Sequence, residues 1–150
     1  GELYVGDIRD SGWGGGPNHG AIVRLTPNLQ TLPPGIAEVT AVESGFEIRF
    51  TQAVDRVRAA DRTNYTISSV TRVPTPAYGG PDQDRSTESI VDLDVSTDGR
   101  RVRIVLDEMK AGYVYEFRLK NLSEEPLFHP AVAFYTLNVV PGAASKSEER

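Results

Sequence analysis

The amino-acid sequence predicts an all-β protein, an antiparallel β-sandwich with a β-hairpin extension at its N-terminus. Several short segments alternate apolar and polar residues, which is typical of strands with one buried face. Glycine and proline, at 14 and 10 of 150 residues, favour turns over helices. This length accommodates one sandwich of about 100 residues with extensions, whereas two full domains would be cramped.

The clearest hairpin spans residues 91–106, where two alternating segments flank Asp98-Gly99. If this pair is a two-residue turn, three apolar couples share one face: Val91 with Leu106, Leu93 with Ile104, and Val95 with Val102. Asp94 then lies opposite Arg103 on the other face. A shift of one residue would move carboxylates into the core, so the alternation strongly specifies this register.

A third strand is predicted over residues 113–119. Its apolar face carries Tyr113, Tyr115, Phe117 and Leu119, and its polar face Glu116, Arg118 and Lys120. In the connection to this strand, Gly112 precedes Tyr115 by three positions. This spacing resembles the corner between strands E and F of immunoglobulin-like (Ig-like) and fibronectin type III domains, where the tyrosine hydroxyl returns to the backbone. The alternative is that Tyr115 is simply a core aromatic.

The resemblance implies an Ig-like/fibronectin III-like antiparallel β-sandwich, in which Asp98, Gly99, Gly112 and Tyr115 have structural roles. Composition divides the chain into four parts. Residues 1–25 form a β-hairpin around a Gly-rich loop, 26–35 a Pro-rich linker, 36–141 the sandwich and 142–150 a disordered tail. The chain begins inside an apparent strand and shows no signal peptide, which suggests a cut within a longer protein.

Further elements are predicted within the sandwich. A second hairpin turns at Ser44-Gly45 and would pair Ala41 with Ile48 and Val39 with Phe50. Residues 54–63 have room for one helical turn. Residues 133–140 form the last strand. Apolar residues occur at both its odd and its even positions, and therefore on both faces, so we expect the strand to be covered on both sides.

Residues 74–87 are the longest stretch without periodicity. Structureless loops of this length are uncommon in compact domains and tend to be binding segments or disordered ones. The sequence leaves open whether this loop contacts a partner or is disordered.

Composition excludes several classes of function. A net charge of -5 without a basic stripe argues against nucleic-acid binding. No window approaches the roughly 20 apolar residues of a membrane span. The absence of cysteine excludes disulfides, thiolate metal sites, cysteine nucleophiles and covalent c-type haem attachment in this chain, and we expect no cofactor.

No catalytic template is complete in the sequence. The two histidines, His19 and His129, lack metal-ligand spacing. Asp92 and Asp94 share a strand face, but an ion pair between Asp94 and Arg103 is a simpler account than acid/base catalysis.

Two loop features are candidates for binding. Asp82 and Asp84, near the carbonyls of the preceding glycines, are weak candidates for a Ca²⁺ site, because hard cations require six or more oxygens. Trp13 and Tyr78 lie in Gly-rich loops, where an exposed ring can stack on a sugar or dock on another domain.

Three stretches resemble the large exported propeller proteins of environmental bacteria. These proteins combine a β-propeller similar to that of glucose/sorbosone (quinoprotein) dehydrogenases with an Ig-like domain and often a c-type haem domain. Residues 1–7 with Gly12-Trp13-Gly14 and 21–25 resemble the end of the propeller, Tyr78-Gly79-Gly80-Pro81-Asp82 resembles a Tyr-Gly-Ser-Pro-Glu loop, and 127–138 resembles the closing Tyr-Tyr-Thr-Leu-Asn strand.

The propeller resemblance implies a non-catalytic accessory domain that packs against an adjacent propeller and spaces neighbouring domains, in the periplasm or outside the cell. No catalytic residue is implied, although the parent protein would be dehydrogenase-like. The candidate contact residues are Trp13, Tyr78, Gly79, Asp82 and Tyr135. The alternative is a carbohydrate-binding module that uses Trp13 and Tyr78 as stacking platforms; an independent enzyme would require a pocket of titratable groups.

Overall fold

The computed structural model describes residues 2–9, 19–26, 28, 32–73, 75–76, 80–124 and 127–142. The chain divides into two compact units, Gly1–Leu32 and Pro33–Arg150. The division falls inside the Pro-rich segment that the sequence identifies as a linker.

The first unit is the predicted hairpin. Strands β1 (Leu3–Arg9) and β2 (His19–Leu25) pair antiparallel, with Leu3 opposite Leu25 and Val5 opposite Val23. The Gly-rich loop between the strands, including Trp13, lies outside the described residues.

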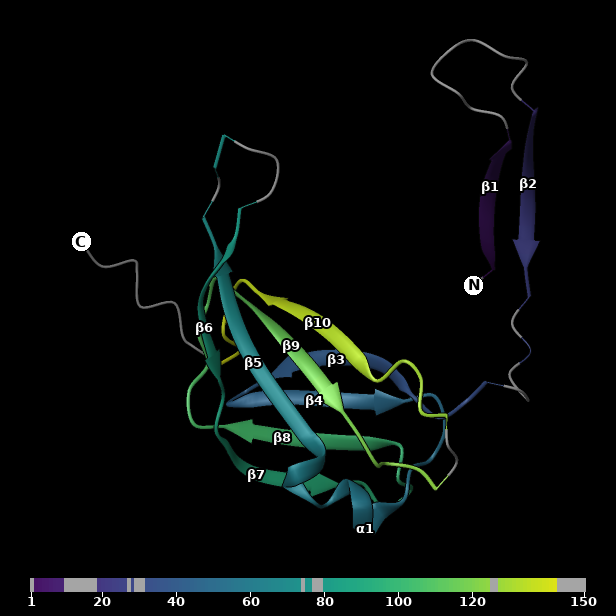
Figure 1. The fold of residues 1–150 in the computed structure, drawn as a ribbon. Helices are drawn as coiled ribbons and strands as arrows, with labels where there is room; N and C mark the ends of the chain where they lie inside the picture. Colours follow the sequence, from purple (N-terminus) through teal and green to yellow (C-terminus); the bar gives the residue numbers. More distant parts are fainter. Residues whose placement is uncertain are drawn as a thin grey trace. The chain divides into compact units, whose positions relative to one another are not determined.

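The second unit is a sandwich of two four-stranded antiparallel sheets (Figure 1). The first sheet, in the order β3-β4-β8-β7, contains β3 Ile36–Val42, β4 Gly45–Phe50, β7 Ile90–Val95 and β8 Arg101–Leu106. The second, in the order β10-β9-β5-β6, contains β5 Tyr65–Arg72, β6 Asp82–Thr87, β9 Tyr113–Leu119 and β10 Val132–Leu137. This arrangement matches the ABED sheet and the GFC sheet extended by C′ of Ig-like sandwiches. The predicted fold class is confirmed.

Short helices connect the two sheets between β4 and β5. The α-helix α1 (Arg56–Ala59) is capped by the Asp55 carboxylate, which accepts a hydrogen bond from Arg58 N at 2.9 Å. A 3₁₀ helix (Arg62–Asn64) follows, capped in the same way by Asp61. The helical turn predicted for this segment is confirmed.

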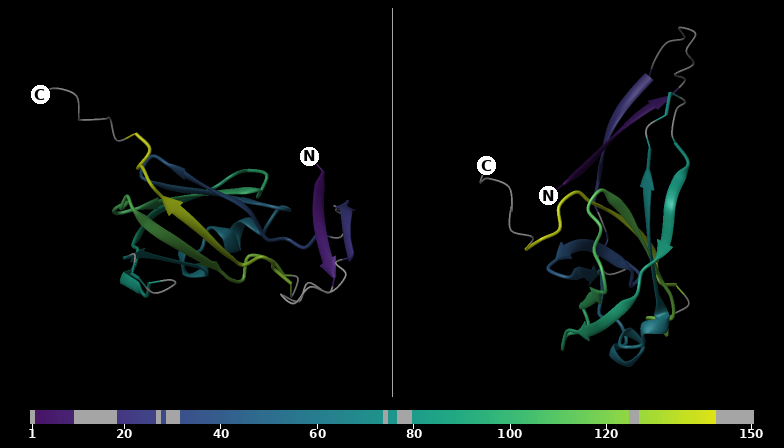
Figure 2. Two further views of the ribbon diagram at one scale, coloured as in Figure 1. Left: turned by 90° about the horizontal axis from the view of Figure 1, so that it is seen from above. Right: turned by 90° about the vertical axis from the view of Figure 1, so that its left-hand side faces the viewer.

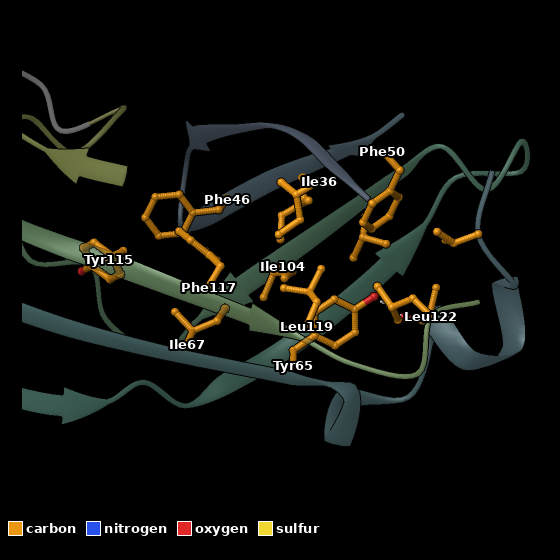
Figure 3. Close-up of a cluster of buried hydrophobic side chains, with 14 of the residues drawn as sticks. Ile36, Phe46, Phe50, Tyr65, Ile67, Ile104, Tyr115, Phe117, Leu119 and Leu122 are labelled. Carbon is orange, nitrogen blue, oxygen red and sulfur yellow. Dashed lines mark hydrogen bonds between the residues drawn. The ribbon is translucent and has the colours of Figure 1, made fainter. Parts of the chain in front are cut away.

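Aromatic rings from both sheets fill the centre of the core (Figure 3). Phe46 of β4 is fully buried, and its ring centroid lies 4.8 Å from that of Tyr115 and 5.0 Å from that of Phe117, both on β9. The surrounding aliphatic residues include Ile48, Ile67, Val102, Ile104, Leu122 and Leu137, all at most 1% exposed. These contacts hold the sheets face to face.

The register of the β7–β8 hairpin is confirmed near its turn. Val95 pairs with Val102, Leu93 with Ile104 and Asp94 with Arg103. Farther from the turn the prediction for Val91 is wrong: the register shifts between Ile90 and Asp92, Ile90 takes the place opposite Leu106, and Val91 is 51% exposed. A β-bulge adds one residue to a strand without changing the alternation near the turn, so the sequence pattern did not reveal it.

The turn of this hairpin is longer than predicted. Ser96 N bonds to Arg101 O at 3.0 Å, which leaves a four-residue loop over 97–100. The Asp98 carboxylate accepts hydrogen bonds from Ser96 Oγ at 2.6 Å and Arg100 N at 3.0 Å. Gly99 has a φ of 66°, where a side chain would be strained. The structural roles predicted for Asp98 and Gly99 are therefore present in a different loop.

The predicted pairing of the β3–β4 hairpin is wrong by two residues. Val39 pairs with Ile48 and Ala41 with Phe46, so the turn residues are Glu43 and Ser44. A slip of two residues keeps the same side chains on the buried face, and apolar alternation cannot distinguish the two registers.

Residues 82–87 form strand β6 rather than part of a structureless loop. All six residues are polar, and the strand pairs with β5 at the edge of its sheet. An edge strand with little buried surface has no apolar alternation, which explains why the sequence pattern missed it. The part of the predicted loop around Tyr78 and Gly79 lies outside the described residues.

The last strand, β10, is covered on one side only, so the expectation of cover on both sides is wrong. Tyr135 and Leu137 face the core, whereas Phe134 is 65% exposed and Val132 is 37% exposed. Val132 and Phe134 therefore form an apolar stripe on the face of β10 that points to solvent.

The predicted tyrosine corner is confirmed. The chain passes from β8 in one sheet to β9 in the other, and Tyr115 lies fully buried just after this crossing. Its hydroxyl accepts a hydrogen bond from Lys110 N at 2.6 Å. Gly112 turns with a φ of 83° and its N–H donates to Leu137 O at 2.7 Å. Tyr115 is both a core aromatic and the corner tyrosine.

Replacing the corner hydroxyl tests its contribution. Tyr115→Phe keeps the ring but leaves Lys110 N without its acceptor, so we expect the free energy of unfolding to fall by about 1.5 kcal/mol in urea titrations followed by circular dichroism. Tyr135→Phe, which keeps its ring on Phe46, is the control. Equal stability of Tyr115→Phe and the parent chain would show that the corner bond contributes nothing.

Gly45 permits the close approach of β4 to β8. A Cβ atom at this position would lie 1.9 Å from the carbonyl oxygen of Ile104. We therefore expect Gly45→Ala to separate these strands and lower the free energy of unfolding by about 3 kcal/mol. Gly6→Ala, where a Cβ would meet nothing within 4 Å, should leave the urea midpoint of the sandwich unchanged.

Candidate functional site

The structure describes two of the five predicted contact residues. Trp13, Tyr78 and Gly79 lie outside the described residues. Asp82 begins β6 and Tyr135 lies on β10, and these strands form opposite edges of the same sheet. The structure therefore does not bring Asp82 and Tyr135 together.

Tyr135 is part of the core packing. Its side chain is half-buried, and its ring lies edge-on to Phe46 with the centroids 5.5 Å apart. The ring faces the interior of the sandwich, and contact of Tyr135 with a partner stays a prediction.

The carboxylate of Asp82 is held by two arginines. Arg72 Nε lies 3.0 Å from one oxygen and Arg85 Nη2 lies 2.7 Å from the other. The hydrogen bond from Arg85, and then that from Arg72, lowers the pKa of Asp82. Asp84 is exposed with a φ of 50°. Two guanidinium groups at Asp82 oppose a cation, and the described residues contain no metal-binding group of three or more His, Cys, Asp or Glu.

The remaining polar candidates have local partners. Asp92 lies 3.6 Å from Arg62 Nη2. Asp94 and Arg103 face each other in the strand register as predicted, but the ion pair predicted between them is not among those of the described residues, and Arg103 donates to the Glu43 carbonyl at 3.4 Å instead. His129 is exposed and lies beside the point where the chain enters the sandwich. The side chain of His19 lies outside the described residues.

The outer face of the β10-β9-β5-β6 sheet carries a charged cluster that the sequence did not reveal. Glu116 of β9 points away from the core, yet it is only 5% exposed because two arginines cover it. Arg85 Nη1 lies 2.8 Å from one carboxylate oxygen, and Arg118 Nη2 contacts the other. The hydrogen bond from Arg85 is the main cause of the lowered pKa of Glu116. A buried carboxylate is stable here because it is fully paired.

An open groove of about 510 Å³ surrounds this cluster. Strands β5, β6 and β9 line it with Thr66, Ser68, Arg85, Ser86, Thr87, Glu116 and Arg118. Phe134 and Val132 of β10 lie directly opposite Glu116 and Arg118 in the strand register, so an exposed apolar stripe runs beside the groove. A smaller groove of about 360 Å³ on the other sheet includes Arg49 and Arg101.

The sequence contained partial signals for this surface. In the predicted strand 113–119, Glu116 and Arg118 alternate with the apolar residues, which indicated that they face outward. In the last strand, Phe134 belongs to the second of the two alternating sets of apolar residues. Arg85 was missed because its partner Glu116 is 31 residues away and β6 has no recognisable strand pattern.

A second, partly buried polar cluster lies at the corner between β8 and β9. The Glu88 carboxylate accepts hydrogen bonds from Ser69 Oγ at 2.5 Å and Ser86 Oγ at 2.8 Å, and Lys110 Nζ lies 3.1 Å from the same oxygen. Burial favours the protonated acid, but these three donors outweigh it, so the pKa of Glu88 is lowered.

Lysine beside serine is a known arrangement for activating a nucleophile. Here the pKa of Lys110 is raised, chiefly by its hydrogen bond to Glu88, so its amine stays protonated and cannot take the proton of Ser86. Ser69 is fully buried. The cluster fastens the β5–β6 pair to the corner.

This cluster makes stability depend on pH. Because the native pKa of Glu88 lies below its ordinary value of 4.5, its contribution is present above that pH and is lost as the pH falls through the native pKa. We expect Glu88→Gln to lower the free energy of unfolding by about 1 kcal/mol at neutral pH, with the difference shrinking in acid. Urea titrations from neutral to acid pH measure the difference in free energy of unfolding, and the exposed Glu38→Gln is the control. A difference for Glu88→Gln that does not change with pH would contradict a stabilising role of the Glu88 carboxylate.

The apolar face of the hairpin unit is made by four side chains. Leu3, Val5, Val23 and Leu25 share this face and are each between 42% and 60% exposed. The other face is mixed: Glu2 accepts a hydrogen bond from Tyr4 and an ion pair from Arg24, and Ile22 is 80% exposed. Both faces therefore expose apolar side chains, and four of them lie together on one face.

The chain enters and leaves the sandwich at opposite ends (Figure 2). At the point of entering, Ile36 N bonds to Pro130 O at 2.8 Å and His129 N bonds to Pro34 O at 2.9 Å, beside the start of β10. After β10 the chain reaches Gly142, which lies next to Glu43 in the turn at the far end of β3. The length of the sandwich thus separates the two connections.

Comparison with known proteins identifies the fold but no family. No protein-family model and no curated protein matches the chain. Solved structures of the bacterial S-layer protein SbsC are similar. The crystal structure of rSbsC(31-844) has a TM-score of 0.52 and 22% identity, covering 71% of this chain and 14% of that one. The N-terminal part of SbsC has a TM-score of 0.53 and 20% identity, covering 73% and 24%.

At this identity the likeness shows the fold alone. The class of protein is an all-β, Ig-like sandwich of a kind that also occurs in a bacterial surface-layer protein. The chain spans 14% to 24% of the SbsC chains that it resembles. Among the described residues, no helix is long and apolar enough to cross a membrane. The resemblance of residues 1–25, 78–82 and 127–138 to exported propeller proteins stays a prediction.

Proposed function

We propose that this chain is a non-catalytic Ig-like accessory module of a larger exported bacterial protein, which packs against one neighbouring domain and spaces others. The observation that carries the proposal is the apolar face of the hairpin, which the described residues of its own unit leave about half exposed. The separation of the two connections of the sandwich supports the spacing role, and the likeness to parts of a bacterial S-layer protein supports a place outside the cell.

A hairpin of two strands is marginally stable in water by itself. Its four apolar side chains are about half exposed, so covering them would contribute on the order of 4 kcal/mol before the costs of association. A neighbouring β-rich domain with an apolar surface, such as the propeller that the sequence resembles, would supply that cover.

The sandwich suits the second role because its connections leave from opposite ends. Strand β3, which runs between them, has seven residues and is therefore about 23 Å long. Domains joined to the two ends would be held apart by roughly this length rather than folded back on one another.

Hydrogen exchange tests the docking role. In the isolated chain we expect the amides of Val5 and Val23 to exchange on the order of a thousandfold faster than those of Phe46 and Phe117. In the longer polypeptide that contains the adjoining domain, the hairpin amides should become protected, because docking buries the apolar face.

Matched variants separate the two faces of the hairpin. Val23→Asp lies on the apolar face and should abolish the gain in protection, whereas Ile22→Asp lies on the other face, is 80% exposed in the parent chain and should preserve it. Hairpin amides that are already as protected as the core in the isolated chain, or that gain nothing in the longer polypeptide, would contradict the proposal.

A further inference from the structure

We propose that the outer face of the β10-β9-β5-β6 sheet binds an acidic saccharide chain, with Arg85 and Arg118 contacting its carboxylates and Phe134 stacking on a sugar ring. This site goes beyond the accessory role, which requires only the hairpin and the two ends of the sandwich. It also differs from a module based on Trp13 and Tyr78, because it uses neither residue.

The charge of the groove favours an anionic ligand. Arg85 and Arg118 flank the single carboxylate of Glu116, and the adjoining Asp82 is shared between Arg85 and Arg72. The cluster therefore has three guanidinium groups and two carboxylates, a local charge of +1 in a chain of net charge -5. Arg118 is 62% exposed, so most of its donors face the groove or solvent.

Arg85 is held in place before a ligand arrives. Arg85 makes hydrogen bonds to Glu116 at 2.8 Å, to Ser68 Oγ at 3.1 Å and to Asp82 at 2.7 Å. A guanidinium group fixed by several acceptors loses little conformational freedom when its remaining edge meets a carboxylate.

The rest of the groove suits a polyhydroxylated ligand rather than a simple ion. Its volume of about 510 Å³ lies within the range typical of small-molecule sites. The hydroxyl groups of Thr66, Ser68 and Thr87 line it and can both donate and accept hydrogen bonds.

Phe134 supplies a stacking surface beside these polar groups. Its backbone lies directly opposite Glu116 in the antiparallel register, which places the Cβ atoms of the two residues about 5 Å apart. The side chain is 65% exposed on the same outer face. An aromatic ring next to charged and hydroxyl groups presents one apolar surface to the carbon–hydrogen face of a sugar and polar partners to its substituents.

The experiment is a titration of the full isotope-labelled chain, read by backbone amide and arginine Nε shifts. The probes are hexagalacturonate, the neutral maltohexaose and inorganic sulfate. We expect saturable shifts around Arg85, Arg118 and Phe134 with hexagalacturonate at concentrations up to ~10 mM, weakened by high salt, and no saturation with the other two.

Two variants and a matched control locate the site. Arg118→Gln should raise the dissociation constant about tenfold, because one charge-assisted contact is lost. Phe134→Ala should raise it about fivefold through loss of stacking. Arg49→Gln removes an arginine that is paired with Glu38 on the other sheet and is similarly exposed, and it should change the constant less than about twofold. Unchanged core amide shifts show that each variant is folded.

Three outcomes would overturn the proposal. Equal binding of maltohexaose would show that the carboxylates are not recognised, and equal shifts with sulfate would show anion binding without sugar recognition. A larger effect of Arg49→Gln than of Arg118→Gln would move the site to the smaller groove. None of these results affects the protection of the hairpin, so failure of this site and failure of the accessory role are distinguishable.

Discussion

The packing of Phe46 against Tyr115 and Phe117 is the contact on which the rest of the sandwich depends. It joins the central strands of the two sheets, and the hydroxyl of Tyr115 ties the same site to the crossing between β8 and β9. Since the rings fill the space between the sheets, both sheets must present their apolar faces inward. Their charged side chains are thereby placed on the two outer faces, where the grooves lie.

Much of the fold could be predicted because it depends on local alternation. The strands other than β6, the faces of β8 and β9, and the tyrosine corner all follow from residues close together in the chain. The pairing of β3 with β4 could not be predicted to the residue, because a slip of two positions leaves the buried face unchanged. The bulge at Val91 depends on packing that the sequence pattern does not contain.

The candidate site was harder to predict for a different reason. Arg85 and Glu116 meet only because the polar strand β6 adds to the edge of β5, and nothing in its six residues indicates a strand. Conversely, the prominent aromatic Tyr135 was predicted as a contact residue but packs on Phe46. The resemblance that singled out Tyr135 does not tell which face of the strand its side chain occupies.

The outer edges of the two sheets have a consequence for association between copies of the chain. The edge strand β6 has only polar residues and an irregular register with β5, and the edge strand β7 contains a bulge and two aspartates. Flat edges with free backbone groups pair readily with one another and lead to aggregation, whereas bulged and charged edges do not. The edges formed by β6 and β7 are therefore poor templates for pairing between copies of the chain.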